Sequence, residues 1–158
     1  MSIEYIRVNV DNWLLYKQDV FKLEEIFPES IRCDLDLLEE TMLDINNIAY
    51  VAVVDNKVAG YGLAEPLLAC LNVDGCNRDK KSLPNTLYLS SCSVYSEYRN
   101  IGISKGLRQY RITEGLRQGY NRFTAHIRTG KMPDKHIVIE SFDDWNGYGS
   151  FDYLEILI

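Results

Sequence analysis

Two apolar segments joined by a two-residue turn constrain the fold more than any other feature of this chain. Residues 48–65 read IAYVAVVDNKVAGYGLAE, with β-branched and other apolar residues on both sides of Asp55 and Asn56. Aspartate and asparagine tolerate the positive φ that a tight hairpin turn requires. The segment therefore predicts a β-hairpin in the middle of the chain.

A strand and two helices are predicted before this hairpin. Apolar and polar residues alternate over Ile3–Val10, which indicates a strand. Apolar residues at steps of three and four then predict a helix that ends at Pro28, and its buried stripe is Trp13, Tyr16, Val20, Leu23 and Phe27. A second helix begins near Asp34, and its apolar face is Leu35, Leu38, Met42 and Ile45.

The pattern after the hairpin predicts a strand, a helix and two more strands. Residues 66–85 lose the periodicity and are interpreted as a surface excursion. Strands are expected at Thr86–Val94, Arg122–Ile127 and Phe151–Ile158, and a helix from Gly102 to Gly119. That helix is expected to be buried on two sides. One apolar side is formed by Ile103, Leu107 and Tyr110, and the nearly opposite side by Ile112 and Leu116. This order describes a mixed α/β sheet with helices packed on it.

Size and charge narrow the classes of function. The 158 residues suit one domain, residues 1–158, and the net charge of -6 without a cluster of lysine and arginine argues against nucleic-acid binding. No apolar run is long enough to span a membrane, and the first residues do not resemble a leader, so we expect a cytoplasmic protein. The spacing of Cys33, Cys70, Cys76 and Cys92 favours reduced thiols over metal ligands, with a disulfide between Cys70 and Cys76 as the alternative.

The stretch from Val94 to Ser104 has the properties of an anion site. A strand stops at Val94 and a helix begins near Gly102, which leaves backbone N–H groups without partners at the positive end of the helix dipole. Glycine lets an anion approach, Arg99 adds a bidentate donor and Ser104 adds a hydroxyl. The alternative is that Gly102 only shapes a sharp start of the helix, which needs no ligand.

The sequence VYSEYRNIGISKGL, residues 94–107, resembles the acyl-CoA-binding motif of the GNAT superfamily of N-acyltransferases. That motif runs Val-x-Pro-x-x-Arg-x-x-Gly-x-Gly/Ala. Val94, Arg99 and Gly102 match it, whereas Ser96 replaces the usual proline and Ser104 the final glycine or alanine. The resemblance implies an α/β (α+β) fold with a mixed, mostly antiparallel central sheet flanked by helices.

The resemblance also implies a donor and a reaction. The pyrophosphate of CoA would lie on the backbone N–H groups of Asn100, Ile101, Gly102, Ile103 and Ser104. The pantetheine arm would pair with the strand near Ser93 and Val94, where a bulge separates that strand from the next, and an N–H there would polarise the thioester carbonyl. A neutral amine would then attack acetyl-CoA directly, with a base taking its proton and an acid protonating the thiolate.

The acid and the base are less well defined. Many family members place a tyrosine four residues before a Gly-Phe pair; here Gly147 and Tyr148 resemble that pair and Asp143 stands at the tyrosine position. Tyr148 is therefore the candidate acid, with Tyr153 as a second choice. His126 and Glu65 are candidate bases, although each also fits a purely structural or solvated role, and a water relay would need neither.

Two functions stay open at this point. The first is an N-acetyltransferase acting on a primary amine, either a small molecule or a protein amino group; Asp34, Asp36, Glu39 and Glu40 could attract its cation or be a solvated helix face. The alternative is a catalytically weak or inactive module that binds acyl-CoA or a protein partner. Another type of phosphate binder is disfavoured because neither Gly-x-x-x-x-Gly-Lys-Ser/Thr nor Gly-x-Gly-x-x-Gly occurs.

The end of the chain allows two architectures. Either the sheet stops one strand short of the family pattern, or HIVIESF, residues 136–142, is a strand where the family has its last helix. An unpaired edge would favour a homodimer.

Overall fold

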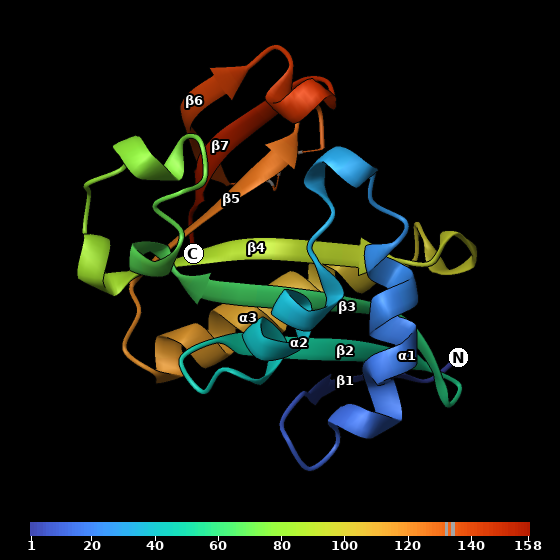
Figure 1. The fold of residues 1–158 in the computed structure, drawn as a ribbon. Coiled ribbons are helices and arrows are strands. Elements are labelled where there is room, and N and C mark those ends of the chain that lie inside the picture. Colours follow the sequence, from blue (N-terminus) through green and yellow to red (C-terminus); the bar gives the residue numbers. More distant parts are fainter. Residues whose placement is uncertain (132, 134) are drawn as a thin grey trace.

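One mixed sheet organises the molecule (Figure 1). The computed structural model describes residues 1–131, 133 and 135–158, and within them seven strands follow the order β1-β2-β3-β4-β5-β7-β6. The strands are β1 (Ile3–Arg7), β2 (Ile48–Val54), β3 (Lys57–Pro66), β4 (Thr86–Val94), β5 (Arg122–Arg128), β6 (His136–Phe142) and β7 (Phe151–Ile156). Neighbours are antiparallel except β4 and β5. The predicted mixed, mostly antiparallel sheet is confirmed.

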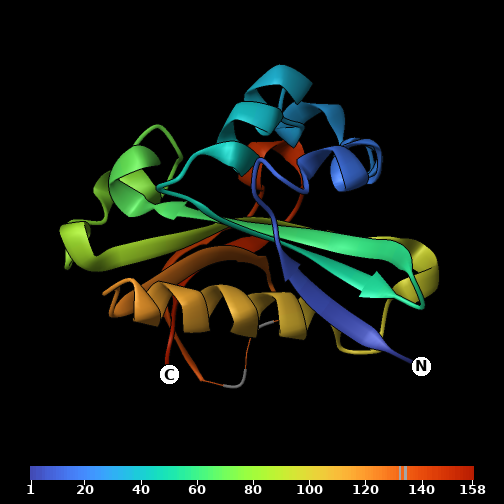
Figure 2. The same cartoon turned by 90° about the horizontal axis from the view of Figure 1, so that it is seen from below.

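Helices cover both faces of the sheet, as Figure 2 shows. Helices α1 (Trp13–Glu24) and α2 (Leu35–Leu43) lie on one face and α3 (Ile103–Arg117) lies on the other. Each face has its own apolar cluster, with Leu23 and Leu38 in one and Leu107 in the other. The two helices predicted before the hairpin are therefore present, and they bury the faces that their periodicity indicates.

The helix predictions need corrections at four residues. Helix α1 ends at Glu24 rather than at Pro28, so Phe27 lies in the connection after the helix. Ile45 is 91% exposed because α2 already ends at Leu43. The two-sided cover expected for α3 is wrong: Tyr110 and Leu116 are each 45% exposed, since only one side of this helix packs on the sheet. Its buried residues are Ile103, Leu107, Arg111, Ile112 and Gly115.

The predicted hairpin is confirmed as β2 and β3. Asp55 and Asn56 connect them with φ values of 48° and 67°, the left-handed conformation expected for this turn. Every residue of β2 is buried, because α2 and α3 pack on its opposite faces. The hairpin is thus the centre of the half-sheet formed by β1 to β4.

Strands β4 and β5 part soon after they meet. Their parallel pairing joins Thr86–Tyr88 to Arg122–Thr124, and Figure 1 shows β5 leaving β4 at an angle. Opposite β3, β4 advances three residues from Tyr88 to Ser91 while β3 advances two from Glu65 to Leu63, so β4 carries a bulge at Leu89 and Ser90. The bulge expected near Ser93 and Val94 therefore lies earlier in the strand, close to the point where β4 and β5 separate.

The end of the chain is a strand pair, so the architecture with one strand fewer is wrong. Residues 136–142 form β6, which pairs antiparallel with β7, and β7 lies between β5 and β6. Strand β6 is consequently an edge strand, and its Ile137, Val138 and Ile139 are 40% to 49% exposed. The homodimer expected from an unpaired edge stays a prediction.

The excursion from residue 67 to residue 85 is more than a surface loop. It contains three short 3-10 turns, Leu67–Ala69, Cys76–Arg78 and Leu83–Asn85. Its Asp79 is buried and accepts hydrogen bonds from Arg122 of β5 at 2.9 Å and from the Tyr153 hydroxyl of β7 at 2.6 Å. The excursion therefore fastens the β5–β7–β6 part of the sheet to the strands that precede it.

The four cysteines are free thiols, so the disulfide alternative between Cys70 and Cys76 is wrong. Burial raises the pKa of the Cys76 thiol to about 12 and that of Cys70 beyond its usual range. Within the described ranges no helix is long and apolar enough to cross a membrane.

Candidate active site

The parting of β4 and β5 opens a cleft of about 710 Å³. Its walls come from β4, the start of α3, β5, the connection between β6 and β7, and the connection between α1 and α2. The last two connections contact each other through their short 3-10 turns, Glu29–Ile31 and Trp145–Gly147. The cleft thus joins the predicted phosphate loop to the region where the candidate acid lies.

The loop before α3 has the backbone that the glycine pattern indicates. Gly102 is the N-cap residue of α3 with φ of 90°, a conformation that favours glycine, and a Cβ built there meets no atom within 4 Å. The N–H groups of the first helical turn have no partner within the helix itself, and the space beside Gly102 is open. Arg99 lies beside the loop, and its Nε donates to the carbonyl oxygen of Val94 at 3.2 Å, which ties the loop to the end of β4.

The predicted donor-binding residues gather along this cleft. Seven of the eight line it, namely Ser93, Val94, Arg99, Asn100, Gly102, Ile103 and Ser104. Ile101 is not among the lining residues, and its side chain is 41% exposed. The sequence motif thus identifies two neighbouring parts of the cleft wall, the end of β4 and the loop before α3.

Basic side chains that the sequence reading missed extend the anion-binding character of the cleft. Besides Arg99, the cleft is lined by Lys105, Arg108, Arg111, Arg128 and Lys131, and its described lining contains no aspartate or glutamate. In a chain with a net charge of -6 this is a concentrated positive field. The spacing of Ser104, Arg108 and Arg111 on α3, four and three residues apart, was the available sign of a basic helix face.

Arg111 is buried behind the bulge of β4. It is 3% exposed, and its Nη1 donates to the carbonyl oxygens of Leu63 at 2.7 Å and Ser91 at 3.0 Å. A Cβ at Gly62 would lie 2.8 Å from its Nε, so the absence of a side chain at that position makes room for the guanidinium. Burial lowers the pKa of Arg111, yet an arginine stays protonated at any physiological pH. A fixed positive charge therefore supports the irregular part of β4.

His126 is a neutral, fully hydrogen-bonded residue on β5. Its Nε2 lies 2.8 Å from the carbonyl oxygen of Asp74, which can only accept, so Nε2 carries the proton and Nδ1 accepts from the Tyr88 hydroxyl at 2.7 Å. Its ring stacks on Trp145 with a centroid distance of 4.4 Å. Burial lowers the pKa of His126 to about 4. The pair of Tyr88 and His126 spans the gap where β4 and β5 separate.

Tyr148 lines the cleft beside Arg128, whose Cζ lies 5.1 Å from the centre of the Tyr148 ring. Asp143, at the position where the family has its usual tyrosine, is exposed. The second choice of acid, Tyr153, does not line the cleft: it is fully buried and donates to Asp79. Tyr148 is therefore the candidate acid that the structure brings to the cleft.

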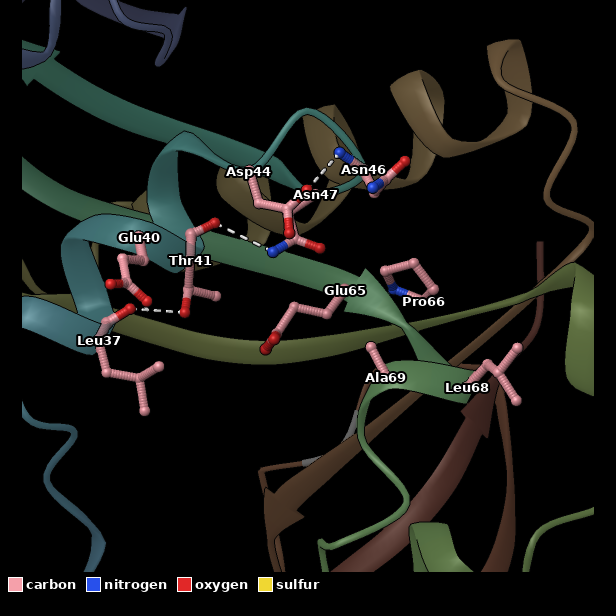
Figure 3. Close-up of a pocket in the computed structure, with 10 residues that line it drawn as sticks. All are labelled: Leu37, Glu40, Thr41, Asp44, Asn46, Asn47, Glu65, Pro66, Leu68 and Ala69. Atoms are coloured by element: carbon pink, nitrogen blue, oxygen red, sulfur yellow. Dashed lines mark hydrogen bonds between the residues drawn. The ribbon is translucent and has the colours of Figure 1, made fainter.

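Glu65 lies outside the cleft. It ends β3 and lines a separate pocket formed with α2 and the start of the excursion (Figure 3). Burial raises the pKa of Glu65 above its usual value, and hydrogen bonding to Ser90 partly offsets that rise. Because Ser90 lines the cleft, Glu65 touches the cleft wall from behind rather than facing into it.

Comparisons with known proteins agree with this geometry. The family model described as acetyltransferase (GNAT) family matches residues 15–136. No curated protein sequence matches the chain. Among solved structures, a chain of the NatC complex bound to Gag peptide and CoA has a TM-score of 0.72 and 15% identity, and the alignment covers 100% of this chain and 99% of that one.

Two bacterial structures are similar to the same extent. A GCN5-related N-acetyltransferase from Kribbella flavida has a TM-score of 0.70 and 13% identity, over 99% of this chain and 98% of that chain. A ribosomal-protein-alanine N-acetyltransferase from Brucella melitensis has a TM-score of 0.66 and 15% identity, over the full length of both chains. At these identities the similarity concerns the fold.

Proposed function

Because this chain belongs to the GNAT acetyltransferase family, we propose that it transfers an acetyl group from acetyl-CoA to a primary amine. The observation that carries the proposal is the cleft itself, where the glycine loop before α3 and the bulged strand β4 line one space. A strand that has parted from its neighbour offers free backbone groups to an extended ligand, and a helix N-terminus beside it offers donors to phosphate.

The basic lining supports acetyl-CoA as the donor. In the proposal the pyrophosphate lies on the N–H groups of residues 100–104, where Gly102 leaves space. Lys105, Arg108 and Arg128 supply positive charge to the phosphates from the cleft walls. The acyl arm follows β4 towards the bulge at Leu89 and Ser90, where the strands part.

The chemistry is a direct transfer. The nitrogen of a neutral amine attacks the thioester carbonyl carbon, a C–N bond forms and the C–S bond breaks. The CoA thiolate takes a proton, which we assign to the Tyr148 hydroxyl at the cleft wall, and the nitrogen loses one to a base or water. Solvent then returns a proton to the Tyr148 oxygen.

His126 and Glu65 differ in how well each could accept the amine proton. His126 has both nitrogens engaged and a pKa of about 4, so at neutral pH it is a weak proton acceptor that mainly orients Tyr88. Glu65 has the raised pKa of a better base but contacts the cleft only through Ser90. We therefore assign the proton to a water relay along Tyr88 and Ser90, with Glu65 as the final acceptor.

The acceptor class covers small amines and protein amino groups. Two of the similar structures concern proteins named for peptide substrates, the NatC complex bound to Gag peptide and the ribosomal-protein-alanine N-acetyltransferase. Peptides with a free N-terminus therefore belong in the acceptor panel beside polyamines, aminoglycosides and amino acids.

Calorimetry and a thiol-release assay test the proposal. Acetyl-CoA and CoA should both bind the wild-type chain, and CoA should appear when acetyl-CoA is mixed with the correct acceptor. Absence of binding at millimolar ligand would refute the donor assignment. Replacing Tyr148 with Phe should lower kcat and leave the affinity for acetyl-CoA unchanged, because the ring stays and only the hydroxyl is lost.

A second candidate function is an acyl-CoA-binding module without turnover. The observation that favours it is the shortage of proton donors and acceptors in the cleft. Asp143 replaces the usual tyrosine, and both ring nitrogens of His126 already have hydrogen-bond partners. This module would bind acetyl-CoA with normal affinity and release no thiol with any acceptor in the panel.

A further inference from the structure

The cleft has two ends of different chemistry. One end, formed by the loop before α3 and the end of β4, is the part that holds the proposed donor. The other end lies between the connection that joins α1 to α2 and the connection that joins β6 to β7, and these connections lie side by side (Figure 1). We call it the acceptor end, and its lining residues are Ile26, Phe27, Ile31, Trp145, Tyr148 and Phe151.

Apolar side chains line the acceptor end without contributing to the core. Three of them come from the connection after α1, namely Ile26, Phe27 and Ile31. On the opposite side, Phe151 packs on Trp145 with ring centres 5.2 Å apart. None of these five belongs to the three apolar clusters of the described core or packs against one. Apolar groups that gather in a cleft outside the core are typical of a site for an apolar part of a ligand.

The charge of the cleft disfavours an acceptor with a second cationic group. Six basic residues and no aspartate or glutamate line the described part of the cleft. One of them, Arg128, brings this charge to the acceptor end, because its Cζ lies 5.1 Å from the ring centres of both Tyr148 and Phe151. A second ammonium group on the acceptor would be repelled, whereas a single amine is favoured in the neutral form that must react. The rest of the acceptor is therefore uncharged.

A buried donor at the same end points to a carbonyl group on the acceptor. Among the described residues, Trp145 Nε1 is the buried side-chain nitrogen or oxygen that has no hydrogen-bond partner. The ring is held by stacking on His126, with the two ring planes 12° apart. An indole N–H can only donate, and buried N–H groups normally have an acceptor. Because Trp145 lines the cleft, the carbonyl oxygen of a ligand is a partner that this position can meet.

The turn that carries Trp145 has the backbone for a local adjustment. The indole nitrogen is covered by protein, so a ligand reaches it after a small shift of the turn Trp145–Gly147. Asn146 and Gly147 are exposed, and Gly147 and Gly149 have φ of 77° and 101°. Glycine reaches conformations that other residues do not, so this turn can adjust at low cost. Binding of a carbonyl group therefore needs no opening of the fold.

We propose that the acceptor is an α-amino amide with one large apolar side chain, which is the chemistry of a peptide N-terminus that begins with a residue such as leucine. This assignment rests on the proposed acetyltransferase function for the transfer step. The apolar side chain lies among Ile26, Phe27 and Ile31, and Trp145 Nε1 donates to the first carbonyl oxygen. Trp145 is thus a specificity residue, because it recognises the group next to the reacting amine.

Thiol release from acetyl-CoA is measured with a panel of related amines. Leucinamide, glycinamide and lysinamide share the α-amine and the carbonyl group and differ in the side chain. Isopentylamine has the side chain of leucinamide and lacks the carbonyl group. A tetrapeptide that begins with leucine and free leucine complete the panel, and kcat/KM is compared for each acceptor.

The apolar side chain is tested with Ile31→Ser. In the wild type, kcat/KM for leucinamide should exceed that for glycinamide at least 10-fold, because the leucine side chain is buried, and lysinamide should be poorer than glycinamide. The ratio of leucinamide to glycinamide should fall about 5-fold in Ile31→Ser. Ile45→Ser, the same exchange at a 91% exposed position outside the cleft lining, should keep the wild-type ratio.

The carbonyl group is tested with Trp145→Phe, which keeps an aromatic ring beside His126 and removes the N–H. The ratio of kcat/KM for leucinamide to that for isopentylamine should fall about 10-fold relative to the wild type, with the ratio of leucinamide to glycinamide unchanged. The pKa values of the two amines cancel, because they are the same for both proteins. Trp13→Phe also removes an indole N–H, at a position outside the cleft lining, and should keep the wild-type ratio.

Equal kcat/KM for leucinamide and glycinamide in the wild type, or a preference for lysinamide, would overturn the proposal. So would an unchanged ratio of leucinamide to isopentylamine in Trp145→Phe. A faster reaction of free leucine than of the tetrapeptide would assign the site to amino acids and would also overturn it.

Binding of the reaction product separates this proposal from the transfer activity. Calorimetry with N-acetyl-leucinamide and N-acetyl-glycinamide, with and without CoA, requires no turnover. If the first binds more tightly, Ile31→Ser removes the difference and no amine releases thiol, the acetyltransferase function fails and the apolar site stands. If thiol is released without any preference among the amides, the acetyltransferase function stands and the assignment of the acceptor fails.

Discussion

The cleft and the pocket of Figure 3, which we call the acidic pocket because Glu40, Asp44 and Glu65 line it, lie on either side of one strand pair and carry opposite charge. Six basic residues and no carboxylate line the described part of the cleft, whereas three carboxylates and no basic residue line that of the pocket. Tyr88 and Ser90 on the cleft side are adjacent to Glu65 on the pocket side. This separation keeps carboxylates out of the cleft, where they would repel the proposed polyanionic donor.

The contrast also separates two ways of placing charge. In the pocket, Glu40 and Asp44 are exposed at the surface. In the cleft, Arg111 is buried and held by backbone carbonyl groups. Buried charge is costly to remove and surface charge is not. Substitutions on the cleft side should therefore have the larger effects.

The largest effect is expected from Arg111→Met. The change removes the guanidinium donor from the carbonyl oxygens of Leu63, Ser91 and Leu107, so we expect a loss of about 4 kcal/mol in the free energy of unfolding. Arg117→Met at the exposed end of the same helix should cost about 0.5 kcal/mol or less. Urea unfolding of both variants measures the difference, and equal losses would show that Arg111 does not support the bulge.

The next largest effect is expected in the pH dependence of stability, which His126 at the cleft wall controls. His126 has a folded-state pKa of about 4, below its ordinary value of 6.5, so the unfolded chain takes up this proton first as the pH falls. Stability from this group is complete above about pH 6.5 and is lost towards pH 4, by about 3 kcal/mol in total.

This pH dependence is tested by replacing each of the two histidines of the chain with phenylalanine in turn. Between pH 6.5 and 5, stability should fall less steeply in His126→Phe than in the wild type. His136→Phe, the same exchange at the other histidine, serves as the control. Thermal unfolding across this pH range measures both, and identical slopes in all three proteins would contradict a neutral His126 in the folded chain.

A smaller effect is expected from Gly102→Ala. The new Cβ meets no protein atom, so the change acts on the ligand that approaches the loop and on the backbone, which has φ of 90°. Gly119→Ala is the matched control, because that glycine has φ of 99° and equal space. The affinity for CoA should fall about 30-fold in the first variant, the equivalent of about 2 kcal/mol, and remain unchanged in the second. Calorimetry decides, and equal affinities would remove the loop from the donor site.

The smallest effect is expected from Lys105→Met, which removes one exposed charge from the cleft wall. The affinity for CoA should fall about 3-fold at low salt, with the difference disappearing near 0.5 M salt because counter-ions screen exposed charge. Lys57→Met at the exposed start of β3 changes the net charge equally and should not affect the affinity. A salt-independent difference would indicate a packing role for Lys105 instead.

The sequence was sufficient for elements whose signal is local. The hairpin turn at Asp55 and Asn56 and the glycine loop at Gly102 are encoded in a few consecutive residues, and both occur where predicted. The exposure of Tyr110 and the burial of Arg111 were missed. A buried arginine is rare, and the carbonyl groups that make it favourable come from a bulge in a strand distant in sequence.

The candidate site was predictable to the same extent. The donor loop is contiguous, so the motif located seven residues that line the cleft. The acidic pocket is assembled from α2, the connection to β2, the end of β3 and the start of the excursion, and no short motif records that Glu40, Asp44 and Glu65 line one pocket. The sequence indicates Glu65 only as a candidate base, and Asn47, which lines the same pocket, has no distinguishing pattern.

The buried contacts of Asp79 determine how wide the cleft can open. Strands β4 and β5 are paired at three positions. This short pairing leaves room for the β5–β7–β6 part of the sheet to rotate relative to β1–β4. Asp79 is bonded to Arg122 of β5 and Tyr153 of β7, so it connects these strands to the excursion that begins at the end of β3. The excursion therefore resists rotation between the two parts of the sheet, although none of its residues line the cleft. A change in the length of the excursion would alter the distance between the cleft walls.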